Sequence, residues 1–344
     1  MSVFSEKLIA WQKSHGRNDL PWQVKEPYVR WLSEVMLQQT QVSTVLGYFD
    51  RFIKRFPDVF TLAAAHEDEV MQYWAGLGYY SRARNLHRCA QVVVEKYQGQ
   101  FPRTRDSLES LPGIGRSTAA AIMAFSFDAR ETILDGNVKR VLARYLAIDG
   151  PVNQSAVSKL LWEKAQALVP DAEMTPYTQG LMDLGALVCT RTPKCDLCPV
   201  STHCQARQCG RELELPTPMP RKSRPQRTRT FLLLWQDESV WLEKRQQKGV
   251  WQGLFSLPEI DGELDEELAE AAAMQLGFEV RNVRVLPSLI HDFSHYRLLI
   301  NPVAICIKKA PMTDENHLFI EASHRDLVGL PAPIETILSN FFKA

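Results

Sequence analysis

Four cysteines fall within sixteen residues in the middle of the chain. Cys189, Cys195, Cys198 and Cys204 follow the spacing C-x5-C-x2-C-x5-C. Thiolates so spaced can surround one metal centre. A structural zinc site usually has two C-x2-4-C pairs, whereas this segment has one such pair with longer arms. The spacing therefore favours an iron–sulfur cluster, with zinc as the alternative.

Two carboxylates stand where they could perform acid–base chemistry. Glu34 lies beside the apolar stripe of an amphipathic segment, together with Gln38, where a glutamate is usually solvated. If Glu34 faces a cleft instead, burial would raise its pKa and suit it to donate a proton. Asp135 precedes Gly136 at a loop-to-helix junction. It is either a helix N-cap or a carboxylate that stabilises positive charge on a sugar.

A Gly-x-Gly turn joins two helical segments in LPGIGRSTAAAI, residues 111–122. Pro112 should end the first helix, and Gly113 and Gly115 should permit a turn with positive φ. Backbone N–H groups at the start of the second helix can hold a phosphate without reading base sequence. A plain helical hairpin is the alternative.

Two tyrosines stand between a glycine turn and basic side chains in GLGYYSRARNL, residues 76–86. This composition suits a wedge that enters a stack of bases while Arg82 and Arg84 hold phosphates. One of the two tyrosines can instead belong to the core.

The elements that position these residues change type along the chain. Up to about residue 205, apolar positions recur every three or four residues, which predicts an all-α bundle. The predicted helical segments include residues 29–49, 68–78, 84–97 and 154–169. Residues 213–230 are rich in Pro, Lys and Arg, which is typical of a linker. Beyond it, the period changes to that of a small α+β domain. Strands are predicted at 230–235, 239–245, 283–289 and 296–308, and a helix at 265–277.

The chain has 344 residues, enough for two domains with their own cores. We divide it into a helical domain (1–210), a linker (211–229) and an α+β domain (230–344). The formal net charge of zero hides an asymmetry, because residues 1–229 carry 30 Lys and Arg against 23 Asp and Glu. This excess favours a polyanion as the partner of the first part, although it is also within ordinary variation. We find no secretory signal and no apolar run of membrane-spanning length, so we expect a cytoplasmic protein with reduced thiols.

Together these motifs resemble the helix-hairpin-helix DNA glycosylases with an iron–sulfur cluster, most specifically the MutY-type adenine DNA glycosylases. The resemblance covers nearly the whole chain and rests on several segments in a fixed order. They are residues 21–42, 76–86, 111–122, 133–144, 177–190, 249–259 and 291–298, with the four cysteines.

The resemblance implies a role for each candidate residue. Glu34 would protonate adenine and later help to activate water, and Asp135 would stabilise the oxocarbenium-like sugar. Asn137 and Ser117 would line the same pocket, which the flipped-out adenine must enter. Gln39 and Tyr79 would fill or wedge the opened stack. Further DNA contacts are expected at Arg82, Arg84, Gly113, Gly115, Arg116, Lys139 and Arg191.

Ser117 bears on the reaction type. In the relatives resembling endonuclease III, this hairpin position is a lysine whose amine attacks the sugar. A serine cannot form a Schiff base. We therefore expect a glycosylase that leaves an abasic site without strong strand cleavage.

The C-terminal domain resembles the Nudix hydrolases that act on oxidised guanine nucleotides. Gly253 and Glu259 fit the start of their signature, but Ala271 and Ala272 replace the paired glutamates that bind Mg²⁺. We therefore expect this domain to recognise 8-oxoguanine rather than hydrolyse nucleotides. Its contact loop would be Phe293, Ser294 and His295.

The expected cofactor is one [4Fe-4S] cluster, although the first cysteine gap has five residues where the family usually has six. The expected partner is double-stranded DNA with adenine opposite 8-oxoguanine or guanine. We expect a monomer, associated with the bacterial nucleoid through DNA. The alternatives are a DNA-damage-binding protein without catalysis and a nucleotide hydrolase.

Overall fold

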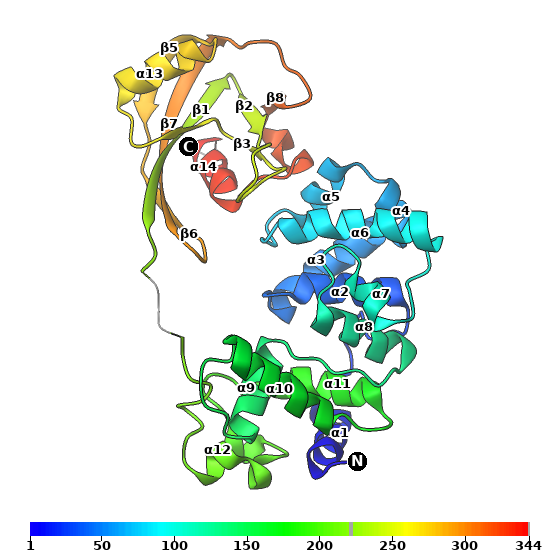
Figure 1. Cartoon of the computed structure of the whole chain (residues 1–344). Coiled ribbons are helices and arrows are strands. Elements are labelled where there is room, and N and C mark those ends of the chain that lie inside the picture. The colour runs from blue at the N-terminus through cyan, green and yellow to red at the C-terminus, as the bar shows by residue number, and fades with distance from the viewer. Residues whose placement is uncertain (220–222, 343–344) are drawn as a thin grey trace. The chain divides into compact units, whose positions relative to one another are not determined.

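The computed structural model describes residues 1–219 and 223–342 (Figure 1). The chain forms two compact units. The first unit contains Met1–Ala63 and Arg88–Arg221, and the second contains Ala64–His87 and Lys222–Ala344. Residues 64–87, which periodicity assigns to the helical domain, thus belong to the same unit as the C-terminal strands. Part of the predicted linker, residues 220–222, lies outside the described residues.

The N-terminal two thirds of the chain are helical, as periodicity predicts. The helices up to the hairpin are α1 (Val3–His15), α2 (Pro27–Leu37), α3 (Val42–Arg55), α4 (Val59–Ala64), α5 (Glu67–Trp74), α6 (Ser81–Tyr97), α7 (Arg105–Glu109) and α8 (Arg116–Phe127). Those after it are α9 (Gly136–Tyr145), α10 (Ser155–Leu168), α11 (Met174–Asp183), η1 (Leu184–Val188), η2 (Cys195–Leu197), η3 (Ser201–His203) and α12 (Gln205–Gln208).

The expectation of one continuous helix over residues 29–49 is wrong. Glu26 caps α2 by accepting the N–H of Val29, and α2 ends at Leu37. Residues 38–41 leave the helix before α3 begins, and Gln39 has φ 59°. This break contains no glycine or proline, so the local sequence does not signal it.

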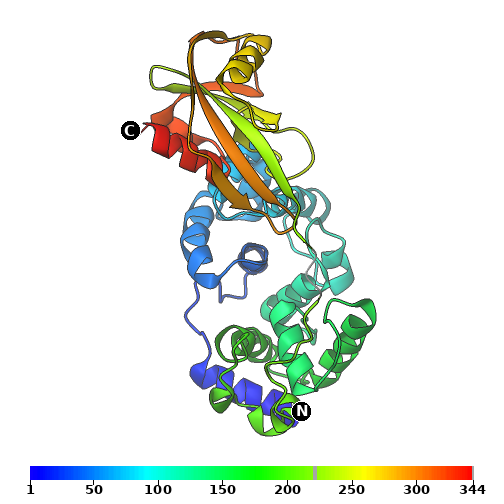
Figure 2. The same ribbon diagram turned by 90° about the vertical axis from the view of Figure 1, so that its left-hand side faces the viewer.

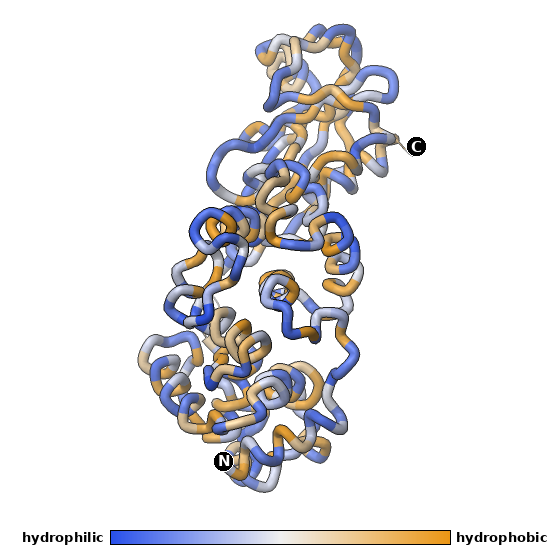
Figure 3. The backbone as a smooth tube through the Cα atoms, turned by 90° about the vertical axis from the view of Figure 1, so that its right-hand side faces the viewer, coloured by the Kyte–Doolittle hydropathy of each residue, from blue (hydrophilic) through white to orange (hydrophobic). Residues whose placement is uncertain are grey.

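The core of the first unit holds the helices that carry the candidate site. α1 packs on α11, α2 packs on α3 and α8, and α9 packs on α10, α11 and η1. Apolar side chains of α8, α9 and α11, such as Ala120, Val138 and Leu181, are fully or almost fully buried in one cluster. Figure 3 shows hydrophobic and hydrophilic positions interleaved along the helical coils of the backbone, the pattern of amphipathic packing.

The second unit contains a mixed sheet. Its strands are β1 (Gln226–Gln236), β2 (Ser239–Lys244), β3 (Phe255–Ser256), β4 (Glu259–Asp261), β5 (Glu279–Val285), β6 (Leu289–Asp292), β7 (Arg297–Lys309) and β8 (His317–Glu321). The strand order is β3-β2-β1-β7-β5, with β4, β6 and β8 pairing with β1, β7 and β2. The two long strands β1 and β7 run parallel and side by side (Figure 2).

Helices cover both faces of this sheet. Alternate residues of β1 point to opposite faces, and each set contacts a different helix. Leu232 and Leu234 pack with Ala269 and Ala273 of α13 (Glu266–Gln275). Trp235 contacts Phe341 of α14 (Ala332–Phe342), with ring centroids 5.3 Å apart. The 3-10 helix η4 (Ala322–Leu327) precedes α14.

Two details of the predicted α+β region need correction. β1 begins at Gln226, inside the predicted linker, because its pairing with β7 already starts at Gln226 and Arg297. The predicted strand 283–289 is divided, since β5 ends at Val285 and β6 starts at Leu289. Pro287 between them cannot donate a ladder hydrogen bond. Among residues 1–219 and 223–342, no helix has the length and apolar character that a membrane span requires.

Candidate active site

Glu34 lies in the last two turns of α2 and is partly buried. Burial raises the pKa of its carboxyl to about 7, the charge of Arg30 opposes this rise, and the charge of Asp135 adds to it. Arg30 is buried, and its Nε donates to the Val24 carbonyl at 2.6 Å. A carboxyl with this pKa is about half protonated at neutral pH and can act as a general acid.

Asp135 is the N-cap of α9, which confirms one of its two predicted roles; its action on a sugar stays a prediction. Its Oδ1 accepts the N–H of Val138 at 2.8 Å, which satisfies one of the free donors at the helix start. Burial raises the pKa of this carboxyl, although the N–H groups of Val138 and Asn137 and the charge of Arg140 oppose the rise. Since its charge acts on Glu34, the two carboxylates from distant parts of the chain lie near one another.

Ser117 connects the hairpin to the segment before Asp135. Its Oγ accepts the N–H of Leu134 at 3.0 Å. One end of α2 is held to the same helix, because Gln38 Nε2 donates to Thr118 Oγ1 at 3.3 Å. α8 is therefore the element that joins the two catalytic candidates.

The hairpin has the predicted helix–turn–helix form, with one correction. Gly113 has φ 77°, but Gly115 has φ −93° and ψ 171°, an extended conformation open to any residue. Gly115 is instead the N-cap of α8, without a side-chain cap. Outside its chain neighbours and its own helix backbone, no described atom lies within 4 Å of the position that a Cβ of Gly115 would take, so the start of α8 is open here, and phosphate binding stays a prediction.

Asn137 is held on α9 by contacts that the sequence pattern did not reveal. Arg140 Nη2 donates to Asn137 Oδ1 at 2.8 Å and to the Gly185 carbonyl at 2.7 Å, and its Nε donates to the Cys189 carbonyl at 2.8 Å. Gly185 must be small here, because a Cβ would lie 2.7 Å from the Cβ of Asn137. The segment with Asp135 and Asn137 is thus tied directly to the first cysteine.

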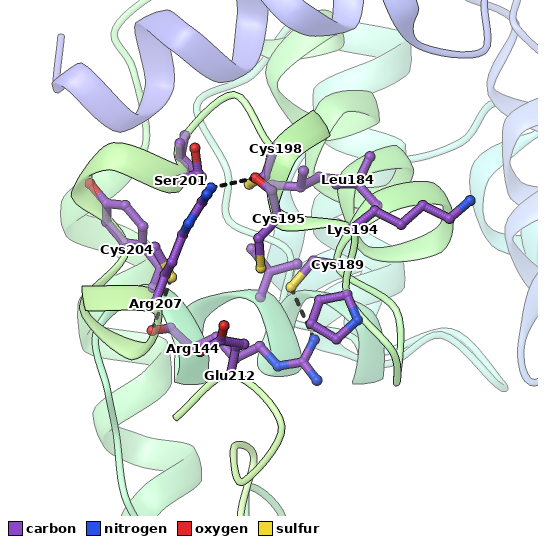
Figure 4. A pocket seen from close by; sticks show the side chains of 15 residues that line it. Arg144, Leu184, Cys189, Lys194, Cys195, Cys198, Ser201, Cys204, Arg207 and Glu212 are labelled. Atoms are coloured by element: carbon purple, nitrogen blue, oxygen red, sulfur yellow. Dashed lines mark hydrogen bonds between the residues drawn. The ribbon is translucent and has the colours of Figure 1, made fainter. Parts of the chain in front are cut away.

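The cysteines line one pocket of the first unit (Figure 4). Figure 4 shows their sulfur atoms arranged around a common space. Burial, together with the other three thiols, raises the pKa of Cys198 to about 11. Arg144, also missed in the sequence, is buried here; its Nη1 donates to Cys189 Sγ at 3.4 Å. In the described part of the chain, no three His, Cys, Asp or Glu side chains are grouped as a site for a single metal ion.

Residues 75–80 form a loop of the second unit between α5 and α6, and its two tyrosines have different surroundings. Tyr80 is buried, and its hydroxyl accepts the N–H of Gly76 at 3.1 Å, so the core interpretation applies to Tyr80. Tyr79 is 48% exposed and has φ 50°. Gln39 in the first unit is likewise exposed with positive φ. Strained, exposed residues of this kind are frequent at binding sites.

The two arginines that follow this loop lie in the first turn of α6, where Arg82 is buried and Arg84 is half-buried. The guanidinium of Arg82 is buried, donates to the carbonyls of Leu77 and Gly78 at 3.3 and 3.1 Å, and lies over the Tyr79 ring. Arg84 donates to the Gln252 carbonyl. Arg82 thus supports the loop that carries Tyr79, whereas Arg84 binds the segment after β2; contact of either side chain with phosphates stays a prediction.

Phe293, Ser294 and His295 form the turn between β6 and β7. The turn is closed by the Phe293 N–H, which donates to the Tyr296 carbonyl at 2.9 Å. Ser294 and His295 are exposed. A cavity of about 510 Å³ brings this turn together with Tyr79, and all its lining residues belong to the second unit. We call it the recognition pocket.

Other predicted DNA contacts lie at the surface of the first unit. Arg116 is exposed at the start of α8, with its guanidinium 3.9 Å from the centre of the Trp162 ring. Lys139 donates to Asn153 Oδ1 at 3.3 Å. Arg191 is exposed beside the first cysteine.

Comparisons with known proteins agree with this arrangement. Residues 32–167 match the HhH-GPD superfamily base excision DNA repair protein family, and residues 229–340 match the NUDIX domain family. An adenine DNA glycosylase of Buchnera aphidicola subsp. Baizongia pistaciae is 36% identical over 99% of this chain and 97% of its own length. The adenine DNA glycosylase of Homo sapiens is 32% identical over 91% of this chain and 69% of its own.

Solved structures of DNA repair enzymes are similar to about 60% of this chain. A thermostable thymine-DNA glycosylase is 31% identical, with a TM-score of 0.55, over 60% of this chain and 96% of its own. A complex of endonuclease III with DNA has a TM-score of 0.52 over 60% of this chain and 94% of its own, at 22% identity, and supports the fold alone. The full-length similarity to curated relatives carries the assignment: the chain belongs to the adenine DNA glycosylase family.

Proposed function

We propose that this protein removes adenine paired with 8-oxoguanine or guanine from double-stranded DNA, by hydrolysis of the N-glycosidic bond. The observation that carries the proposal is the pair of unlike carboxylates, with Glu34 at a pKa of about 7 beside Asp135. Adenine is a poor leaving group until it is protonated, and a second carboxylate can stabilise the charge that develops on the sugar.

Each side chain has a separate task in this reaction. The protonated Glu34 carboxyl donates its proton to the flipped-out adenine as the glycosidic bond breaks. The Asp135 carboxylate, held in place by its cap to Val138, faces the positive charge on the sugar. The Glu34 carboxylate left after proton transfer then accepts a proton from the attacking water. Asn137, fixed by Arg140, lines the pocket beside them.

Ser117 predicts that the DNA strand stays intact. Its hydroxyl is already used as an acceptor for the Leu134 N–H and has no amine to attack the sugar. In a single-turnover reaction on duplex DNA with one adenine opposite 8-oxoguanine, we expect strand breaks only after alkali and no adduct with borohydride. Strong cleavage without alkali, accompanied by a trapped adduct, would overturn this assignment. Tight binding without breaks in either sample would favour a damage-binding protein.

We assign recognition of 8-oxoguanine to the recognition pocket. Ser294 and His295 can hydrogen-bond an altered base edge, and the exposed Tyr79 ring offers a stacking surface. Replacing both Ser294 and His295 with alanine should reduce the preference for adenine opposite 8-oxoguanine over adenine opposite guanine by roughly tenfold or more. The ratio of single-turnover rates at low enzyme concentration measures this. An unchanged ratio would refute the assignment.

The four-cysteine pocket is proposed to hold one [4Fe-4S] cluster. The pocket gathers four thiols with a buried arginine beside one of them, which fits a cluster of thiolate ligands with negative charge. Such a cluster would hold the cysteine loop in one conformation. Arg140 and Arg144 of α9, which both donate to Cys189, would then fix this loop against α9. Metal analysis distinguishes the readings, because iron with sulfide supports the cluster and zinc alone contradicts it.

The protein is further proposed to act as a monomer bound to DNA in the bacterial cytoplasm. The predicted domains 1–210, 211–229 and 230–344 are retained as a proposal with two changes: the linker ends before β1 begins at Gln226, and residues 64–87 pack with the C-terminal domain. Proposed phosphate contacts come from the hairpin glycines and from Arg116, Lys139 and Arg191, with Gln39 and Tyr79 at the opened base stack. Arg82 is proposed to support Tyr79 in its loop, and phosphate contacts of Arg82 and Arg84 remain part of the proposal.

A further inference from the structure

The second unit contains another cavity next to the recognition pocket. It has a volume of about 210 Å³ and is lined mainly by residues of β1, β7 and the loop after β2. A water molecule needs roughly 10–15 Å³ by this measure, so the cavity can hold a group as large as a phosphate. Its walls combine Arg227, Arg229, Arg245 and Lys248 with the aromatic rings of Trp251 and Tyr296.

Two of the four basic side chains are already neutralised. Arg245 pairs with Glu259 through two contacts, of 2.9 and 2.7 Å. Arg229 pairs with Asp261. These two arginines are fixed in position, and their charges are matched by carboxylates.

The other two cations leave the cavity positively charged. The Arg227 guanidinium lies 4.7 Å from the centre of the Tyr296 ring, and Lys248 is exposed. Neither has an ion pair with any residue that the structure describes. Two positive charges with no carboxylate partner, on an aromatic wall, favour an anionic ligand.

The cavity and the recognition pocket share a wall. Gly249, Val250, Trp251 and His295 line both. Trp251 is buried in this wall with φ 62°, and its ring lies 5.1 Å from the ring of Phe293. A nucleotide with its base against the Phe293–Ser294–His295 turn can therefore extend its phosphate into the basic cavity.

We propose that this cavity binds the phosphate of the nucleotide whose base occupies the recognition pocket, through Arg227 and Lys248. The inference rests on the proposed function, since it assumes that the recognition pocket receives 8-oxoguanine. The phosphate belongs either to the DNA strand that carries 8-oxoguanine or to a free oxidised guanine nucleotide. The chemistry of the site is the same in both cases.

The test uses the full-length protein with Arg227→Gln and Lys248→Gln combined. Both side chains are exposed at the cavity, so the fold should persist. The control combines Arg281→Gln and Lys309→Gln, which remove the same charge from exposed positions of the same sheet that do not line the cavity. Affinity for an adenine:8-oxoguanine duplex is measured over a range of salt concentrations. A second arm titrates 8-oxo-dGMP and, for comparison, its nucleoside.

If the bound phosphate belongs to DNA, the double variant should bind the duplex about tenfold more weakly than the wild type. The slope of log affinity against log salt concentration should also be smaller by about 1–2. If the bound phosphate belongs to a free nucleotide, the double variant should bind 8-oxo-dGMP more weakly, whereas the control should not. Affinity for the nucleoside should stay the same in both variants. Either result supports the site and identifies its source. Unchanged binding in both arms, or an equal loss in the control, overturns it. In every case the wild type should still excise adenine, whereas a wild type without excision would instead reject the proposed function.

Discussion

Replacing Glu34 with glutamine should lower the single-turnover rate of adenine excision by roughly 100- to 10,000-fold, because glutamine cannot donate the proton that makes adenine a leaving group. Affinity for the duplex should change only a few-fold, since the shape of the side chain is kept. The matched control is Glu131→Gln, which alters another partly buried glutamate of the same unit, bonded to Arg105 at 3.3 Å. Excision by Glu34→Gln at the wild-type rate would remove Glu34 from the mechanism.

The same substitution should stabilise the protein at high pH. The folded state raises the pKa of Glu34 from 4.5 to about 7. Burial of Glu34 therefore does not reduce the free energy of unfolding below pH 4.5, where the carboxyl is protonated in both states. The free energy of unfolding then falls progressively as the pH rises from 4.5 through about 7. The charged carboxylate then costs about 3 kcal/mol, which glutamine avoids. Denaturant unfolding at pH 8 should show Glu34→Gln to be the more stable protein, and a loss of stability there would contradict burial as the cause.

Asp135→Asn should have the second large effect, and it separates the two roles of this residue. Asparagine is as good an N-cap as aspartate, so stability should change by about 1 kcal/mol or less. The negative charge facing the sugar is lost, so the excision rate should fall at least roughly 100-fold. Single-turnover rates and thermal unfolding of the same samples measure the two effects.

Asp265 provides the control for this experiment. It caps α13 with φ −78° and ψ −177°, against φ −78° and ψ −178° at Asp135, and it accepts the N–H of Leu268 at 2.9 Å. Asp265→Asn should leave excision unchanged. If Asp135→Asn behaves in the same way, Asp135 is only a cap.

Local sequence signals account for much of the fold and of the candidate site. Periodicity predicted the helical bundle, and Asp135 and Asp265 stand at helix starts as capping residues should. The change to alternating strands located the sheet. These features depend on neighbours along the chain, which is why a single sequence reveals them.

The rest depends on contacts between distant segments. Nothing near Arg30, Arg140 or Arg144 marks them as buried or half-buried cations, because their partners are carbonyls elsewhere in the fold. The break at Gln39 has no glycine or proline, and the inclusion of residues 64–87 in the second unit follows from packing alone. The raised pKa of Glu34 likewise comes from burial, which its position beside an apolar stripe left open.

The pH dependence of excision by the wild-type protein tests the central claim most directly. The measurement is the single-turnover rate on an adenine:8-oxoguanine duplex with enzyme in saturating excess, from pH 5 to 9. With Glu34 as general acid at a pKa of about 7, the rate should be level at low pH and fall about tenfold per pH unit above 7. Glu34→Gln should show no such fall in its residual rate. A wild-type rate that stays level to pH 9, or that rises through neutrality, would contradict the account.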